Sequence, residues 1–199
     1  WADIGLPELY GNISVDTTDP ARSNSGNMFA ALLANVLNGG QTLTQENLRT
    51  ILPQLQDIFG KLGYMETSSS DLFSQFLRMG IGAKPVIAGY ESQLIEYAAL
   101  YPDQYETMKD DIVMLYPTPT VWSTHVFIAL DADGQVLLNG LLDEDIQRLA
   151  WEKHGFRTGN YATVSESSSL TAQGVADTIT QVTQVPSYDV MKVIIEQLQ

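Results

Sequence analysis

The sequence contains no cysteine, so disulfides, thiolate nucleophiles and cysteine-ligated metals are excluded. The two histidines, His125 and His154, lie far apart and do not form the close pair typical of a zinc site. Glycine-rich phosphate loops, dinucleotide-binding motifs and the Gly-x-Ser-x-Gly turn of hydrolases are also missing. The run Asp131-Ala-Asp-Gly begins like a calcium loop, but its twelfth position is Leu142, so a turn is the better interpretation. We therefore expect no metal, no cofactor and no catalysis.

Basic residues are scarce, because 10 Lys and Arg stand against 24 Asp and Glu, which gives a formal net charge of −14. This balance argues against nucleic acid, since phosphate neutralisation needs clustered cations. It argues equally against docking on anionic lipid. Apolar residues make up 44% of the chain, which is enough for a sizeable core in one or two domains.

Long apolar runs are absent, and none approaches the length needed to span a bilayer. No signal peptide is present either. The chain opens at Trp1 with no Met, which indicates a trimmed sequence, so the missing signal says nothing about location.

The apolar pattern predicts alternating strands and helices. Helical spacing predicts helices over residues 28–37, 44–59, 68–77, 92–100, 135–154, 171–182 and 187–198, with a kink or break at Pro53. Short β-branched and aromatic runs predict strands over residues 11–15, 85–88, 112–116 and 121–130. We expect Ile13–Val15, Val86–Ala88 and Ile112–Leu115 to share one sheet of an α/β domain.

Small polar residues precede the first long helix: Ser23, Asn24, Ser25, Gly26 and Asn27. Backbone amides and the positive end of the helix dipole favour an anion at such a start, and glycine lets a ligand approach the backbone. The alternative is that Ser25 or Asn24 simply caps the helix. Asp16 and Asp19 complicate an anion site and could instead receive a cation or an amine. Arg22 could supply positive charge or could simply be solvated.

A second group of candidates follows the predicted strand at residues 85–88. Tyr90, Glu91 and Gln93 lie where clefts of open α/β sheets bind ligands, although Glu91 is favoured as a helix cap. Trp122 and Ser123 lie on the next extended segment and are further candidates. Trp122 and His125 would face opposite sides of a strand, so at least one of them is expected in the core.

Three stretches, taken in their order along the chain, resemble segments of a known protein family. They are Asp16-Thr-Thr-Asp-Pro-Ala-Arg-Ser-Asn-Ser-Gly26, Lys84-Pro-Val-Ile-Ala-Gly-Tyr-Glu-Ser-Gln93 and Leu115-Tyr-Pro-Thr-Pro-Thr-Val-Trp-Ser-Thr-His125, with a later Gly155-Phe-Arg157. Together they resemble bacterial extracytoplasmic solute-binding proteins of ABC-type uptake systems, the type II two-lobed periplasmic binding proteins. The resemblance covers about residues 11–159.

The resemblance implies a periplasmic-binding-protein-like lobe over residues 10–118, with a short mixed sheet flanked by helices. Residues 119–199 would be the returning part of the first lobe, with C-terminal helices, and the N-terminal half of that lobe would be missing. Thr18, residues 23–27, Tyr90, Glu91, Gln93, Trp122 and Ser123 would contact the ligand. The protein would work outside the cytoplasm or in the periplasm, with a lipoprotein anchor in the missing N-terminal part as one option.

The implied partners are a small-molecule or anion ligand and the membrane permease of an ABC transporter. Oxyanions, small carboxylates and metal chelates all remain open as ligands. Apolar surface left uncovered after Gly134 predicts self-association of the chain. The alternatives are a ligand-sensing domain of a signalling protein and a serine hydrolase that uses Ser123 or Ser25.

Overall fold

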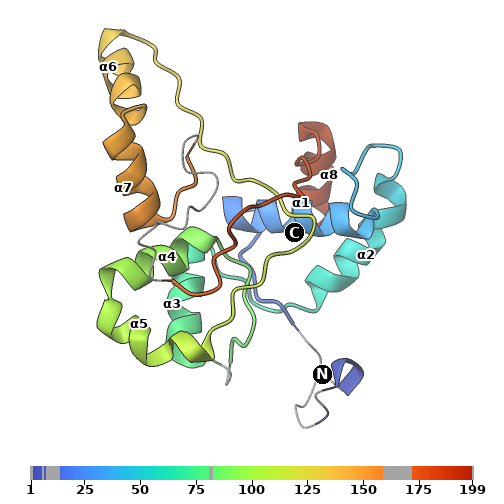
Figure 1. Cartoon of the computed structure of the whole chain (residues 1–199). Coiled ribbons are helices and arrows are strands. Elements are labelled where there is room, and N and C mark those ends of the chain that lie inside the picture. Colours follow the sequence, from blue (N-terminus) through green and yellow to red (C-terminus); the bar gives the residue numbers. More distant parts are fainter. Residues whose placement is uncertain (1, 6, 8–13, 81–82, 159–171, 199) are drawn as a thin grey trace. The chain divides into compact units, whose positions relative to one another are not determined.

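The computed structural model describes residues 2–5, 7, 14–80, 83–158 and 172–198. The chain divides into two compact units, which we describe separately (Figure 1). Unit 1 comprises Trp1–Gly89 and Val185–Gln199, and unit 2 comprises Tyr90–Gln184. Among the described residues, no helix has the length and apolar character needed to cross a membrane.

Unit 1 is built on a helical core. Its helices are η1 (Ala2–Ile4), α1 (Asn24–Leu37), α2 (Leu48–Gly60), α3 (Ser69–Met79) and α8 (Tyr188–Gln197). Helices α1, α2 and α8 pack on one another, and Ala30, Ala34, Leu55 and Ile194 are completely buried between them. Small alanine side chains on α1 let the neighbouring helices approach closely. Because α8 comes from the far end of the chain, the C-terminal segment completes this core.

The turn after α1 is fixed by one buried amide. The side chain of Asn35 is fully buried, and its Oδ1 accepts a hydrogen bond from the backbone N–H of Leu43 at 2.8 Å. Gly39 and Gly40 both have positive φ angles, a conformation that glycine adopts without steric cost. The chain can therefore reverse here and lead directly into α2.

Unit 2 is built around a pair of packed helices. It contains α4 (Glu91–Leu100), α5 (Pro102–Met108), η3 (Lys109–Asp111), α6 (Ala132–Leu141) and α7 (Glu144–His154). Helix α7 packs on α4 and buries Trp151. Gly155 ends α7 at φ +68, and a Cβ there would lie 2.8 Å from the Cα of Ser92. Only glycine permits this close crossing of α4.

The predicted α/β sheet is wrong. Of the described residues, 53% are helical and only 3% are strand, and they form no sheet. Three isolated parallel bridges are all that the described part contains: Asp16 with Ile87, Thr18 with Glu66, and Thr120 with Val182. The predicted strands at 112–115 and 121–130 take part in none of them. Residues 11–13 of the first predicted strand lie outside the described residues.

The pairing stops at single bridges because the chain turns away on both sides. Thr18 is followed at once by a turn that contains Pro20, and Glu66 is followed by the helix cap Ser68. Ile87 is followed two residues later by Gly89 and then by Tyr90, the N-cap residue of α4, so its pairing cannot continue either. The apolar runs have strand-like composition, but a ladder needs more residues on each partner than these turns allow.

The structure agrees better with the predicted helices than with the predicted strands. Those at 28–37, 44–59, 68–77, 92–100 and 187–198 are confirmed, and Pro53 lies inside α2 without breaking it into two elements. The helix predicted at 135–154 is two helices, α6 and α7, and the predicted turn at Asp131 is instead the capped start of α6. The helix predicted at 171–182 is wrong over its described residues 172–182. Helix α5 was not predicted.

Candidate functional site

The start of α1 in unit 1 gathers three hydroxyl groups. Ser25 Oγ lies 2.7 Å from Thr18 Oγ1 and 2.7 Å from Ser23 Oγ. The three hydroxyls therefore form a hydrogen-bonded chain with Ser25 in the middle. Each hydroxyl carries one donor hydrogen, so two bonds within the chain use two donors and leave a third O–H for another acceptor.

Ser23 occupies the N-cap position of α1, in place of the predicted Ser25 or Asn24, yet its side chain does not cap the helix. Its hydroxyl is engaged with Ser25 instead. The N–H groups of the first turn point along the axis and have no acceptor within the helix itself. Together with the helix dipole, they leave positive potential beside the hydroxyl chain.

Gly26 is required by the loop itself. A Cβ at this position would lie 2.2 Å from the backbone oxygen of Thr18 and 2.7 Å from the carbonyl carbon of Asp19. The loop over residues 16–20 thus packs directly on the first turn of α1, and two of its own residues, Thr17 and Thr18, are buried. We predicted that Gly26 makes room for a ligand, but this side of its Cα is filled by the protein's own backbone.

The two acidic residues of this loop are each neutralised locally. Asp16 Oδ1 lies 3.0 Å from Nζ of Lys84, and both side chains are largely buried. Asp19 accepts a hydrogen bond from the backbone N–H of Ala21 at 2.8 Å and faces Arg22 at 3.5 Å. The sequence suggested that these carboxylates complicate an anion site or receive a cation or an amine, and in the structure each has a cationic side chain of the protein beside it. Asn27 donates its backbone N–H to the carbonyl of Ser23 as part of α1.

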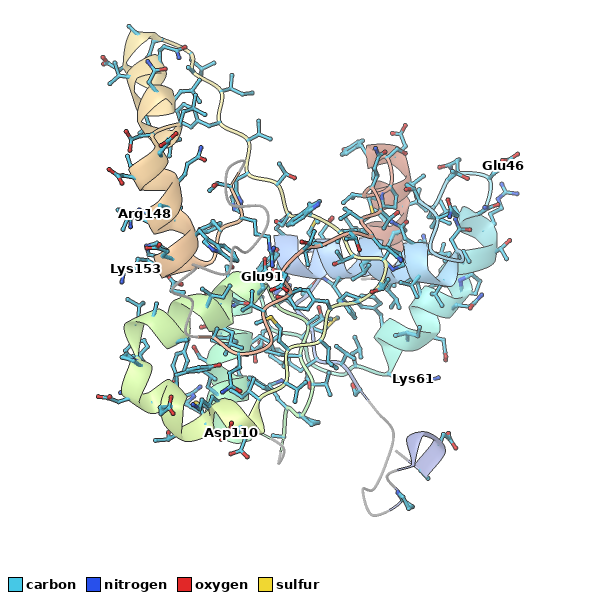
Figure 2. The ribbon with its side chains drawn as sticks, in the orientation of Figure 1. Glu46, Lys61, Glu91, Asp110, Arg148 and Lys153 are labelled. Carbon is cyan, nitrogen blue, oxygen red and sulfur yellow. The ribbon has the colours of Figure 1, made fainter. Side chains whose placement is uncertain are left out.

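The predicted residues of unit 2 belong to a different cluster. Glu91, at the start of α4 (Figure 2), binds Arg157 in a bidentate pair, with N–O distances of 2.5 and 3.0 Å. The hydroxyl of Tyr116 donates to Glu91 at 2.6 Å. The side chains of Arg157 and Glu91 are only 2% and 15% exposed. Glu91 is thus an ion-pair partner and not the helix cap that the sequence favoured.

The cluster is closed on itself. Arg157 also donates to the backbone oxygen of Ala176 at 2.6 Å and lies over the ring of Trp151 at 5.1 Å. Burial, then the hydrogen bond to Glu91, raises the pKa of Tyr116 to about 12, so its hydroxyl stays a donor well above the pH at which a tyrosine ordinarily ionises. Every polar group of this cluster has a partner within unit 2. The cluster therefore holds segments of the chain together and does not offer its polar groups to a ligand.

The other predicted residues surround this cluster loosely. Tyr90 is the N-cap residue of α4, and its backbone N–H donates to Oε1 of Gln93 at 3.0 Å. Trp122 and His125 are both exposed, so the expectation that one lies in the core is wrong. The ring of His125 packs edge-on against Phe156. Ser123 is half-buried, and no hydrogen bond joins it to His125 among the described residues.

Two further features of the described residues limit the chemistry. A recess of about 90 Å³ in unit 2 is lined by Tyr116, Thr118, Thr120, Thr178, Thr180 and their neighbours. Ligand pockets for larger molecules measure roughly 300–1,000 Å³, so this recess is too small for them. No group of three His, Asp or Glu side chains in the described part is arranged to hold a metal ion.

Sequence reasoning missed Arg157 and Tyr116 as members of the buried cluster. Both lie in stretches that carry the family resemblance, but nothing in their spacing indicated that they meet Glu91. Comparison with known proteins adds no family. No protein-family model matches the chain, no curated protein matches it, and no solved structure matches it.

Proposed function

We propose that the chain captures a small anionic solute outside the cytoplasm and delivers it to an ABC-type permease, without catalysing a reaction. The observation that carries this proposal is the hydroxyl chain of Thr18, Ser25 and Ser23 at the uncapped start of α1. A surplus O–H donor, backbone amides and the helix dipole all favour a negatively charged oxygen at this point.

The local charges support an anion over a cation. Asp16 is paired with Lys84 and Asp19 faces Arg22, so the carboxylates nearest the helix start are balanced by cations. The order of the three stretches that resemble solute-binding proteins supports the biological role. The anion site itself uses the loop and helix only and does not depend on a sheet, which the described residues lack.

A calorimetric titration with sulfate, phosphate and acetate tests the site. Charge-assisted contacts contribute roughly 1.5–3 kcal/mol each when desolvated and less on an open face, so we expect a Kd in the millimolar range, about −4 kcal/mol. Ser25→Ala removes the central hydroxyl and should weaken binding about tenfold. Ser25→Pro also removes an amide donor in the first turn of α1 and should weaken binding further.

Ser187→Ala is the matched control, because Ser187 is the N-cap of α8 and its side chain makes no capping bond either. It should leave the affinity unchanged. Equal loss in Ser187→Ala and Ser25→Ala, or no binding of any of the anions by the wild type, would contradict the anion site. Turnover of an ester or phosphate-ester panel that disappears in Ser25→Ala or Ser123→Ala would instead favour a hydrolase.

A further inference from the structure

The tripeptide Leu-Asn-Gly occurs twice, once around Asn38 in unit 1 and once around Asn139 in unit 2. An Asn-Gly pair can react with itself, because glycine has no side chain to keep its backbone nitrogen away from the asparagine amide. The glycine nitrogen bonds to Cγ of asparagine, the Cγ–Nδ2 bond breaks, and Nδ2 takes up the displaced proton and leaves as ammonia. Water then opens the cyclic imide to aspartate or isoaspartate. Since the two tripeptides are identical, their surroundings decide which one reacts.

The reacting atoms around Asn38 are all held by hydrogen bonds. Nδ2 of Asn38 donates to the backbone oxygen of Gln41 at 3.1 Å, and its Oδ1 accepts from Nδ2 of Asn47 at 3.1 Å. The attacking N–H, that of Gly39, donates to the carbonyl of Val36 at 3.1 Å. Helix α1, which this turn ends, forms part of the buried core of unit 1. Reaction at Asn38 therefore needs these bonds to break together at the edge of a packed core.

The side chain of Asn139 is restrained much less. It is exposed, its Oδ1 accepts one exposed hydrogen bond from Nε2 of Gln135 at 3.1 Å, and its Nδ2 has no partner among the described residues. Gly140 lies in the last turn of α6, where its N–H belongs to the helical ladder. Attack by this nitrogen therefore needs only the last turn of α6 to open.

Helix α6 has little to keep it closed. It is 10 residues long, and isolated helices shorter than about 12–15 residues are marginal in water. It includes Gly134 and Gly140, and glycine inside a helix is less favourable than alanine. None of its residues is buried, and its main helix contact is with α7 (Figure 1). Such a segment opens at a far lower free energy than a packed core does.

We propose that Asn139 is a site of spontaneous deamidation, whereas Asn38, in the same tripeptide, is protected by its turn. The product carries a carboxylate in the last turn of α6, at the negative end of the helix dipole. The new charge is also close in sequence to the acidic start of α7, at Asp143, Glu144 and Asp145. Isoaspartate further lengthens the backbone by one carbon and interrupts the helical spacing. Deamidation should therefore unwind the end of α6 irreversibly. This inference does not rest on the proposed anion site.

Peptide mass spectrometry of the intact chain, aged in dilute solution at mildly alkaline pH, tests the proposal. Asn139 should gain the mass difference between an amide and a carboxyl group at least about tenfold faster than Asn38, because the rate follows the population of the open segment. In chain unfolded by guanidinium chloride, the two sites should react at similar rates. Rearrangement of Asp133, which precedes Gly134, leaves the mass unchanged and is not mistaken for this reaction.

Two variants separate the chemistry from the opening of α6. Gly140→Ala should stop the reaction, and its Cβ would meet no atom within 4 Å, so the helix is kept. Asp131→Ala removes the N-cap of α6 without altering the tripeptide and should speed the reaction of Asn139 several-fold. Ser68→Ala is the matched control, because it removes the N-cap of α3 in unit 1 and should leave the rate at Asn139 unchanged.

Equal rates at the two asparagines in the folded chain, or a faster reaction at Asn38, would overturn the proposal. So would an Asn139 that stays intact while the unfolded chain reacts, or a rate that Asp131→Ala leaves unchanged. Hydrogen exchange on the aged protein checks the consequence. The amides of α6 should exchange faster than in fresh protein, whereas those of α1 should not change; equal protection of α6 before and after ageing would contradict the unwinding.

Discussion

The contact between Glu91 and Arg157 shows how a single buried pair joins distant parts of unit 2. Arg157→Met would keep most of the side-chain volume over Trp151 but leave the carboxylate of Glu91 buried without its cation. Removal of one partner of a buried pair costs about 3–5 kcal/mol, and we expect a loss in that range in urea unfolding.

The control for this variant is Arg148→Met on α7. Arg148 (Figure 2) pairs with Asp145 and Glu152, but its side chain is 41% exposed. Exposed pairs contribute about 0–1 kcal/mol, so this variant should lose little stability. Glu91→Gln combined with Arg157→Met should recover part of the loss, because no unpaired charge is left. Equal losses of unfolding free energy for the two single arginine variants would contradict a stabilising role of the buried pair between Glu91 and Arg157.

At the scale of elements, caps decide where helices start in unit 2. Asp143 caps α7 by accepting hydrogen bonds from the N–H groups of Asp145 and Ile146 at 3.0 and 3.2 Å. Because α7 buries Trp151, Asp143→Ala should lower the free energy of unfolding by about 1 kcal/mol.

Asp131→Ala is the informative comparison, since Asp131 caps α6 in the same way through the N–H of Gly134. Helix α6 buries no side chain, so this variant should speed amide exchange within α6 in dilute, monomeric protein while global unfolding hardly changes. A global loss for Asp131→Ala as large as that for Asp143→Ala would mean that α6 is part of the cooperative core.

The helices were predictable because their signals are local. Apolar spacing of the helical period marks α1, α2, α3, α4 and α8, and Gly39 with Gly40, both at positive φ, follow the end of α1. The break between α6 and α7 could have been found from Asp143, a capping residue followed by two acidic residues. Likewise, α5 carries Pro102 at its first turn and Asp103 beside it, which are typical of a helix start.

The strands were not predictable in the same way, because a strand is a property of a pair. Val113 and Leu115 belong to a run with strong strand propensity, yet both are exposed and unbridged. The bridges of Asp16 and Thr18 stay isolated because the chain turns soon after them. Composition alone does not reveal where the chain turns. Pattern alone therefore overstated the sheet.

At the scale of the whole molecule, the predicted site residues fall into two separate units. Thr18 and residues 23–27 belong to unit 1, whereas Tyr90, Glu91, Gln93, Trp122 and Ser123 belong to unit 2. The sequence could place hydroxyls and amides at the start of α1, because a loop that runs into a helix is a local feature. It could not reveal that Glu91 is held by Arg157, because that pair joins residues 66 positions apart.

The most direct test of the proposed function is an NMR titration of the intact chain with phosphate, which follows the backbone amides at the starts of α1 and α8. We expect saturable shifts of the amides of residues 24–27, with a midpoint in the millimolar range, about −4 kcal/mol. The amide signals of residues 188–191 at the start of α8 should not shift. Like α1, α8 has a serine N-cap whose side chain makes no capping hydrogen bond, but it lacks the hydroxyl chain. Absence of shifts at residues 24–27, or equal shifts at both helix starts, would contradict an anion site.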